Sequence, residues 1–446
     1  MPTVAAATDV QTLLSRALAD SPAEATEFVY SETHEDLTRF GANTITQNVM
    51  KSSRQLSVRV QHQGREARVD VSEVDGDTLT RAIKEALAVT AVQARDPDML
   101  PMLSELQHYR AVDYPDPGEM GPEERADAVQ YAIGTCREER ARASGIASTT
   151  RTRTVVMNSF GINAEGHEQH SEFSVTAEKD GGSGWAKSCT IRPRDLDIEG
   201  VTRRALDKAL KDRTARPLPP GDYPVVLESA AVGELMRMMP WMAFNALDYL
   251  QGQHFAIGKL GDKFFDERIT IKDDVWEVPG LPFDYEGVAK QPTVFVQDGR
   301  FVGLAHDRHT ARRLGVAPTG HGMPWPNTMG AWAINLAMKA GATPLREVIA
   351  GLDRGLLVTQ LHYLNVVDRM DLSITGMTRN GTFWVENGQI VHPVQNLRFT
   401  DSLMSLFSHV EALSSERELE SAFWEGNILA PTLRLSKMHF SSPAGF

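Results

Sequence analysis

The chain has 446 residues, 41% of them hydrophobic and 24% charged, a composition typical of globular proteins and a length that favours two domains. Its formal net charge of -13 argues against nucleic acid or an anionic membrane as the main partner, because phosphate groups bind clustered lysine and arginine. No apolar run reaches the roughly 18 residues of a membrane-spanning helix, and the first residues lack a secretion signal, so we expect a cytoplasmic protein.

The first half of the chain alternates helical and strand patterns. Apolar residues at helical spacing predict helices over residues 10–19, 77–94, 121–133 and 201–210. Alternating or β-branched residues predict strands over residues 54–60, 69–71, 149–157 and 172–177. Asp77 is a suitable N-cap for the second helix, and residues 158–161 carry the turn chemistry that would join the last two strands.

The densest proline cluster, at residues 216–221, indicates a domain boundary. We therefore expect an N-terminal α+β domain with a mixed sheet over residues 1–215 and a C-terminal β-rich domain with helices over residues 216–446. Turn dipeptides predict three hairpins, at Asp298-Gly299, Asn380-Gly381 and Asn387-Gly388. Helices are expected over residues 344–352, after a capping Thr343, and over residues 401–413. The predicted fold class is α+β.

Several short motifs occur along the chain in a distinctive order and spacing. They are Phe40-Gly41-Ala42-Asn43-Thr44-Ile45-Thr46-Gln47, Asn158-Ser159-Phe160-Gly161, Asp307 to Ala311 followed by Pro318-Thr319-Gly320-His321-Gly322, Thr375-Gly376, and Gly381 to Ile390. In this order they resemble the TldD/PmbA family, with His321 standing where that family usually has asparagine. The resemblance covers nearly the whole chain. It implies a two-domain α+β protein that forms dimers around an enclosed cavity.

The resemblance also implies a chemistry. In TldD–TldE pairs the zinc lies in the TldD chain, where two histidines and a late cysteine hold it, and the pair cleaves unfolded peptides or processes peptide-derived products. Residues 221–240 resemble the strand and helix that open the family's C-terminal domain. Laid over the TldD zinc motif without gaps, the two histidine positions fall on Arg237 and Met242, and the glutamate position falls on Met238.

These substitutions remove the family's zinc site from this chain. A guanidinium stays protonated, a thioether is a poor zinc ligand, and an apolar side chain cannot activate water. The chain has two cysteines, Cys136 and Cys189, so it also lacks the late cysteine; buried, reduced thiols are the expected state of both. The resemblance is therefore to the PmbA (TldE) branch, with no metal in this chain and zinc expected in a TldD-like partner.

Other histidines and acids are candidates for chemistry. His306, His309 and His321, next to Asp307, could line the cavity wall and act as acid–base or metal-binding groups, although hydrogen-bonded structural histidines are an alternative. His362 and His392 could join them. The His167-Glu168-Gln169-His170 sequence resembles a zinc motif, but its histidines are three apart in a segment expected to be a hairpin or a strand. On a strand they would point to opposite faces, and a polar turn is the ordinary expectation.

Paired carboxyl groups offer a further possibility. Asp273-Asp274, and Asp284 with Glu286, could perform acid–base chemistry if burial separated their pKa values, while solvated loop carboxylates are the ordinary expectation. The sequence contains no nucleophile elbow, P-loop or dinucleotide fingerprint.

Three functional hypotheses follow. The leading one is a TldE/PmbA-like subunit that pairs with a zinc-bearing TldD-like chain and shapes the cavity for a peptide or peptide-derived substrate. Its candidate cleft residues are Arg237, Met242, His306, His309 and His321. The second is a stand-alone hydrolase or natural-product tailoring enzyme that uses His306, His309 and His321. The third is a binding homodimer without catalytic activity.

Overall fold

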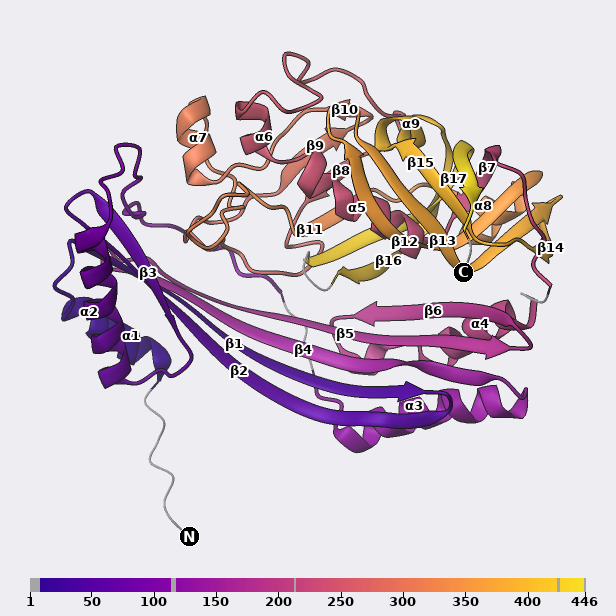
Figure 1. Cartoon of the computed structure of the whole chain (residues 1–446), viewed down its shortest axis with the longest axis horizontal. Helices are drawn as coiled ribbons and strands as arrows, with labels where there is room; N and C mark the ends of the chain where they lie inside the picture. The colour runs from indigo at the N-terminus through magenta and orange to yellow at the C-terminus, as the bar shows by residue number, and fades with distance from the viewer. Residues whose placement is uncertain (1–8, 114–117, 212–213, 423–425, 445–446) are drawn as a thin grey trace, which may run out of the picture.

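The computed structural model describes residues 9–113, 118–211, 214–422 and 426–444. These residues form a six-stranded sheet in the first half and an eleven-stranded sheet in the second, with helices packed on both (Figure 1). The predicted α+β class is confirmed. The domain boundary between residues 215 and 216 stays a prediction. Among the described residues, no helix is long and apolar enough to cross a membrane.

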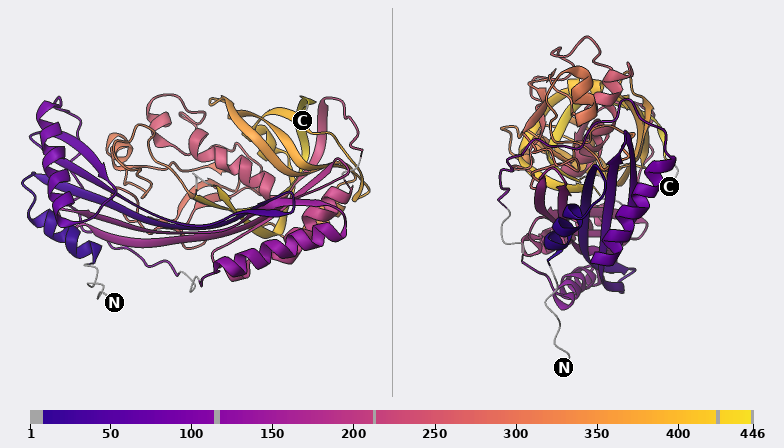
Figure 2. Two further views of the ribbon diagram at one scale, coloured as in Figure 1. Left: turned by 60° about the horizontal axis from the view of Figure 1, so that its bottom comes forward. Right: turned by 90° about the vertical axis from the view of Figure 1, so that its left-hand side faces the viewer.

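The first sheet has the strand order β3-β2-β1-β4-β5-β6. Its strands are β1 (Ala25–Gly41), β2 (Thr44–His62), β3 (Arg65–Val71), β4 (Arg142–Asn158), β5 (Asn163–Lys179) and β6 (Gly182–Thr190). All of its pairings are antiparallel, so the expectation of a mixed N-terminal sheet is wrong. Tight turns join most neighbouring strands, and such turns produce antiparallel pairs. The long strands curve beneath the C-terminal half (Figures 1 and 2).

Helices cover the two ends of the sheet face that points away from the C-terminal half (Figure 2). Helices α1 (Val10–Ala19) and α2 (Gly76–Val92) pack at one end, and α3 (Pro122–Glu138) and α4 (Ile198–Lys211) pack at the other. A short 3₁₀ helix spans Pro193–Asp195. The cap of α2 differs from the prediction: Asp75, not Asp77, accepts the backbone N–H groups of Asp77 and Thr78.

The second sheet follows the path β10-β9-β8-β11-β17-β15-β13-β12-β7, with β14 paired to β13 and β16 paired to β17. Its strands are β7 (Gly221–Leu227), β8 (Ile271–Asp273), β9 (Thr293–Gln297), β10 (Arg300–Phe301), β11 (Asn335–Met338), β12 (Arg354–Asp368), β13 (Ser373–Glu386), β14 (Gln389–Pro393), β15 (Leu397–Ser402), β16 (Val410–Ala422) and β17 (Gly426–Pro443). This sheet is mixed, because β7 runs parallel to β12 and β11 runs parallel to β17.

In the described part of the C-terminal half, the helices that accompany the second sheet are α5 (Ser229–Met242), α6 (Ala246–Leu250), α7 (Arg308–Leu314), α8 (Leu345–Ala350) and α9 (Leu403–Ser408). The last two are shorter than predicted. Pro344, not Thr343, occupies the N-cap position of α8. The expected helix over residues 401–413 is wrong at both ends, because β15 extends to Ser402 and Val410 already pairs with β17.

Two of the three predicted hairpins are confirmed. Gly299 and Gly388 take positive φ between paired strands. The third is wrong, because Asn380 and Gly381 lie inside β13. Their positive φ values of 54° and 130° accompany a register shift against β12, which is the geometry of a β-bulge.

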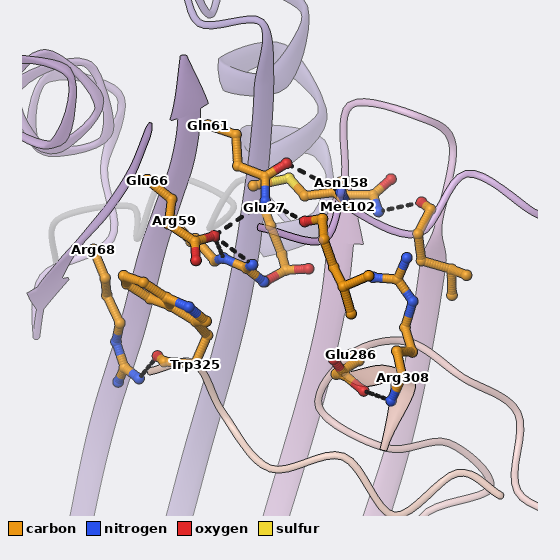
Figure 3. A network of polar contacts seen from close by, with 12 residues as sticks. Glu27, Arg59, Gln61, Glu66, Arg68, Met102, Asn158, Glu286, Arg308 and Trp325 are labelled. Atoms are coloured by element: carbon orange, nitrogen blue, oxygen red, sulfur yellow. Dashed lines mark hydrogen bonds and ion pairs between the residues drawn. The ribbon is translucent and has the colours of Figure 1, made fainter. Parts of the chain in front are cut away.

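Polar contacts join one end of the N-terminal sheet to loops of the C-terminal half (Figure 3). Arg59 on β2 binds Glu27 and Glu66, and its guanidinium lies 5.1 Å from the centre of the Trp325 ring. Arg68 on β3 donates a hydrogen bond to the carbonyl of Trp325. These contacts fix the loop that carries Trp325 against the sheet.

Candidate functional site

Helix α5 begins two residues after strand β7 ends. Three consecutive apolar residues at the end of β7 are fully buried, which anchors the start of the helix in the core. Gly233 packs against β16: a Cβ atom at this position would lie 3.0 Å from Cγ of Glu420. A larger residue would require the Glu420 side chain or the helix to shift by a few tenths of an ångström, so the glycine permits the close approach.

The three positions that correspond to the TldD zinc motif lie on two faces of α5. Arg237 forms an ion pair with Glu234, one turn earlier, and these side chains are 29% and 31% exposed. Met238 and Met242 are buried in the main hydrophobic core of the C-terminal half. The structure thus places the candidate Arg237 on the partly exposed face of the helix and the candidate Met242 on the face that packs into the core.

Zinc does not fit the side chains at these positions. The guanidinium of Arg237 offers only donors, and it already binds Glu234. The thioethers of Met238 and Met242 lack the charge or basicity of the cysteine, histidine and carboxylate ligands that zinc prefers. Across the part of the chain that the structure describes, no group of three or more His, Cys, Asp or Glu side chains is placed to hold a metal ion.

Charges on α5 and on strand β13 affect the pKa of a histidine on strand β12. Burial and the charge of Arg379 lower the pKa of His362, while the charge of Glu234 on α5 acts in the opposite direction. Strand β12, which carries His362, packs against α5. The sequence alone could not place this histidine relative to the helix.

His362 and Arg379 line a cavity of about 1380 Å³ that we call the β12–β13 cavity. Its floor contains a row of paired residues on three adjacent strands, because Met377 on β13 pairs with His362 on β12 and with Arg398 on β15. The turn between β5 and β6 forms a wall, and Ser183 donates a hydrogen bond of 3.4 Å to Oδ1 of Asn380. The cavity therefore lies where the two halves of the chain meet.

The structure brings two of the three predicted histidines together. The backbone N–H of His306 donates to Oγ1 of Thr319 at 2.8 Å, and Nδ1 of His321 lies 2.8 Å from the same oxygen. His309 is in the first turn of α7, and within the described residues its ring forms no hydrogen bond with either of the other two. The three histidines do not form a common cluster of ring nitrogens in this arrangement.

His321 belongs to a buried set of charges that we call the loop network, formed by Asp273, Lys290, His321 and Asn335. Oδ1 of Asp273 lies 3.7 Å from Nζ of Lys290, and Oδ2 lies 3.5 Å from Nε2 of His321. The N–H groups of Ile334 and Asn335 also donate to Oδ2, each at 2.9 Å. Burial alone would raise the pKa of Asp273, but these partners hold it well below its usual value.

Asp284 and Glu286 lie near this network, and the solvated state expected for Asp273 and Asp284 is wrong. Asp273 is 1% exposed and Asp284 is 4% exposed. Burial is the main cause that raises the pKa of both Asp284 and Glu286, and the charge of Asp284 raises that of Glu286 further. Oε2 of Glu286 accepts the backbone N–H of Arg308 at 2.9 Å (Figure 3). Both carboxyl groups accept hydrogen bonds from backbone N–H groups, Glu286 from Arg308 and Asp284 from Gly322.

A second buried charge group joins β6 of the first sheet to β16 of the second. Nζ of Lys187 lies 2.6 Å from Oε2 of Glu420, and Ser421 donates to Glu172 at 2.9 Å. Burial raises the pKa of Glu420 to about 7 and that of the Cys189 thiol to about 12. Sequence analysis missed this group, because its members are distant in sequence and no local motif links them. Buried, unpaired Cys136 and Cys189 agree with the expectation for both thiols.

His167 and His170 lie within strand β5, which is one of the two placements expected for them, and not in a polar turn. The ring of His167 is exposed on the face that carries Glu165 and Arg153, whereas burial lowers the pKa of His170. Their odd spacing on a strand directs them to opposite faces, so one metal ion cannot bind both.

Sequence comparison identifies relatives of this chain among known proteins. The sequence profile of the PmbA/TldA metallopeptidase C-terminal domain matches residues 220–442, and that of the central domain matches residues 115–213. The metalloprotease PmbA of Escherichia coli O157:H7 is 25% identical over 90% of this chain and 89% of its own length. A metalloprotease of Methanothermobacter thermautotrophicus is 27% identical over 64% of this chain and 66% of its own length.

A solved structure extends the likeness to the whole fold. The crystal structure of TldE from Thermococcus kodakarensis superposes with a TM-score of 0.87 and covers 97% of this chain and 100% of its own, at 19% identity. The C-terminal profile alone spans half of the sequence, so it identifies the family without this fold similarity. The chain belongs to the PmbA/TldD metallopeptidase family.

Proposed function

We propose that this chain is the TldE/PmbA-like subunit of a TldD–TldE type zinc metallopeptidase, located in the cytoplasm. The zinc would be bound by a TldD-like partner chain, and the substrates would be unfolded peptides or peptide-derived products. The role of this chain would be to complete and shape the substrate cavity. A homodimer is the alternative assembly.

One observation carries this proposal: helix α5 is present in a family of metallopeptidases but bears Arg237, Met238 and Met242 at the zinc-motif positions. The sequence supplies no cysteine after Cys189, so the late ligand is missing too. A chain that retains the domain but lacks both parts of the metal site fits the role of a partner subunit better than that of a stand-alone zinc enzyme.

The residues of this chain suggest what it would contribute. The ion pair with Glu234 restrains Arg237, so the guanidinium is a fixed positive charge on the surface of α5. Such a group can orient a substrate carboxylate without taking part in bond cleavage. Met242, buried behind it, would support the helix and not contact the substrate directly.

The stand-alone histidine enzyme receives less support. Nδ1 of His321 is engaged by Thr319, and its Nε2 faces the carboxylate of Asp273. Nε2 makes no hydrogen bond in the described structure, but His321 is only 2% exposed, so the ring is closed to a substrate that approaches from solvent. The proposed roles of His306 and His309 stay predictions.

Elemental analysis with an activity assay tests the proposal. We expect the purified chain to contain far less than one zinc per molecule and to leave an unfolded peptide intact. Co-purification with a TldD-like protein from the same source should give a complex that contains zinc and cleaves the peptide. A matched complex in which the partner's zinc-binding histidines are replaced should lose both properties. Stoichiometric metal with hydrolysis by this chain alone would contradict the proposal.

A further inference from the structure

We propose that the β12–β13 cavity is a binding subsite for a carboxylate carried by a peptide, with Arg379 and Arg398 as its recognition residues. This inference rests on the proposed function, because it concerns the peptide that the complete enzyme would act on. The carboxylate could be an acidic side chain or a C-terminus, since both present the same group to an arginine.

The two arginines are positioned to act together. Arg398 pairs directly with Met377, and Arg379 lies two residues further along the same strand as Met377. Such diagonal neighbours on adjacent antiparallel strands are separated by about 7–8 Å at the backbone, a distance that two long side chains can bridge. Both residues line the same cavity. One carboxylate could therefore accept hydrogen bonds from both guanidinium groups.

Neither guanidinium is neutralised by the protein itself. Both side chains are exposed, and within the described residues neither one forms an ion pair or a side-chain hydrogen bond. Two acidic residues also line the cavity. Glu178 pairs with Arg142 at 3.2 Å, and Asp180, in the turn between β5 and β6, has an interaction of its own. In a chain with a net charge of -13, two adjacent cations without internal partners leave positive charge available to a ligand.

The rest of the lining fits a peptide chain. Asn380, Gln395 and Asn396 supply amide groups, which can both donate to and accept from a peptide backbone. Thr382 lines the same cavity, and its hydroxyl is buried without a hydrogen-bond partner in the described structure. This hydroxyl is closed off from the cavity, so the amide groups, and not Thr382, are the contacts offered to a peptide.

The volume and position of the cavity support the same occupant. At about 1380 Å³ it exceeds the roughly 300–1,000 Å³ of typical small-molecule pockets and can hold a segment of several residues. Strand β12, which contributes His362 to the cavity floor, packs against helix α5. The cavity is thus next to the helix on which TldD chains carry zinc. A peptide anchored here by a carboxylate would extend toward that helix.

Calorimetric titration of the full chain with three N-acetylated eight-residue peptides tests the proposal. The first has one central glutamate and a C-terminal amide, the second has glutamine in place of glutamate, and the third has the glutamine sequence with a free C-terminal carboxylate. We expect the first or third peptide to bind about tenfold or more tightly than the second, because charge-assisted hydrogen bonds to arginine are strong. Which of the two binds identifies the source of the carboxylate.

Variants separate the proposed subsite from general charge effects. R379A/R398A should abolish the preference, whereas Arg312→Ala, an exposed arginine on α7 that lies outside the cavity lining, should retain it. Charge reversal in R379E/R398E should transfer the preference to a peptide with central lysine. Affinities for all three peptides within about twofold of each other, or an acid preference that survives in R379A/R398A, would overturn the proposal.

Two further outcomes distinguish competing explanations. Inorganic phosphate that binds tightly in the cavity and is not displaced by the acidic peptides would overturn peptide recognition. Hydrolysis is measured separately in the complex with a TldD-like chain. Cleavage without any preference for acidic peptides would overturn this inference alone. Acid-selective binding by a chain whose complex never cleaves peptides supports the subsite and contradicts the proposed function.

Discussion

The loop network and the β12–β13 cavity use charged side chains in opposite ways. In the loop network, Asp273 is almost fully buried and is surrounded by Lys290, His321 and two backbone N–H groups. In the cavity, Arg379 and Arg398 are exposed, and their guanidinium groups have no ion-pair partner in the described part of the chain. In the loop network the charged groups contact one another, whereas in the cavity the two guanidinium groups face solvent.

This difference shows that residue type alone does not mark a functional site. Histidines, lysines and carboxylates gather in the loop network, as they do in many active sites, yet their hydrogen bonds and ion pairs are directed at one another. Arginines in the cavity are individually ordinary, but they retain their bonding capacity. The following changes should therefore affect folding stability in the first region and ligand binding in the second.

Replacing Asp273 by alanine should cause the largest loss of stability. The change leaves the buried ammonium of Lys290 without its carboxylate and two backbone N–H groups without an acceptor. Breaking one side of a buried pair costs about 3–5 kcal/mol. Guanidinium chloride unfolding at pH 7 measures this loss. The depressed pKa of Asp273 means that its contribution is present above the unfolded value of 3.8 and is lost as the pH falls through the folded value.

Asp262→Ala provides the matched control for this variant. Asp262 is exposed, and within the described residues its side chain forms no ion pair or hydrogen bond. Its loss should therefore change the free energy of unfolding by less than about 0.5 kcal/mol. Equal effects of the two substitutions would show that the loop network does not hold the fold together.

Glu286→Gln should change how the free energy of unfolding depends on pH. Burial and the nearby Asp284 raise the pKa of Glu286 above the unfolded value of 4.5, so the folded chain favours the protonated form. That contribution is fully present below pH 4.5 and is lost as the pH rises through the folded pKa. Glutamine can still accept the N–H of Arg308. The variant should match the parent at low pH and exceed its stability at high pH by on the order of 1–2 kcal/mol.

Thermal unfolding across this pH range checks the expectation, with the exposed Glu267→Gln as the control. The control should show no growing difference from the parent as the pH rises. A Glu286→Gln variant that is less stable than the parent at high pH would mean that the ionised carboxylate, paired with its surroundings, is the favoured folded form.

Two buried threonines give a smaller and more direct contrast. Thr310 donates from Oγ1 to Oδ1 of Asp307 at 2.7 Å, whereas the hydroxyl of Thr382 has no partner in the described structure. Thr310→Val should lose about 1–2 kcal/mol of unfolding free energy, because it leaves a buried acceptor less satisfied. Thr382→Val should be neutral or slightly stabilising. Urea unfolding of both variants measures the difference, and a similar loss in both would indicate that Thr382 is bonded in solution.

Local sequence patterns predicted the elements whose causes are local. The bounds of α1 follow from its apolar spacing, and Pro122 after Gly121 marks the start of α3. The pattern failed at Asn380-Gly381, because a turn dipeptide takes the same positive φ in a β-bulge as in a hairpin. It failed again at Val410, where pairing with Leu435 on β17 overrides the local helical spacing.

The candidate site was predictable only in part, for a related reason. Helix α5, and the residues that stand at the family's zinc-motif positions on it, follow from aligned positions along one segment. The grouping of His306 with His321 follows from nearness in sequence. The row of His362, Met377 and Arg398 depends on the registers of three strands, and the Lys187–Glu420 pair depends on how two sheets pack. Neither arrangement leaves a periodic signal in the sequence.

Arg379→Ala should affect stability as little as the control substitution Asp262→Ala. The side chain is exposed and without an internal partner among the described residues, so its removal should alter the free energy of unfolding by no more than about 0.5 kcal/mol. Urea unfolding measures this value beside the calorimetric affinity for the glutamate peptide, which should fall in the same variant. A large loss of stability would mean that Arg379 serves the fold as Asp273 does, and the distinction between the two regions would then fail.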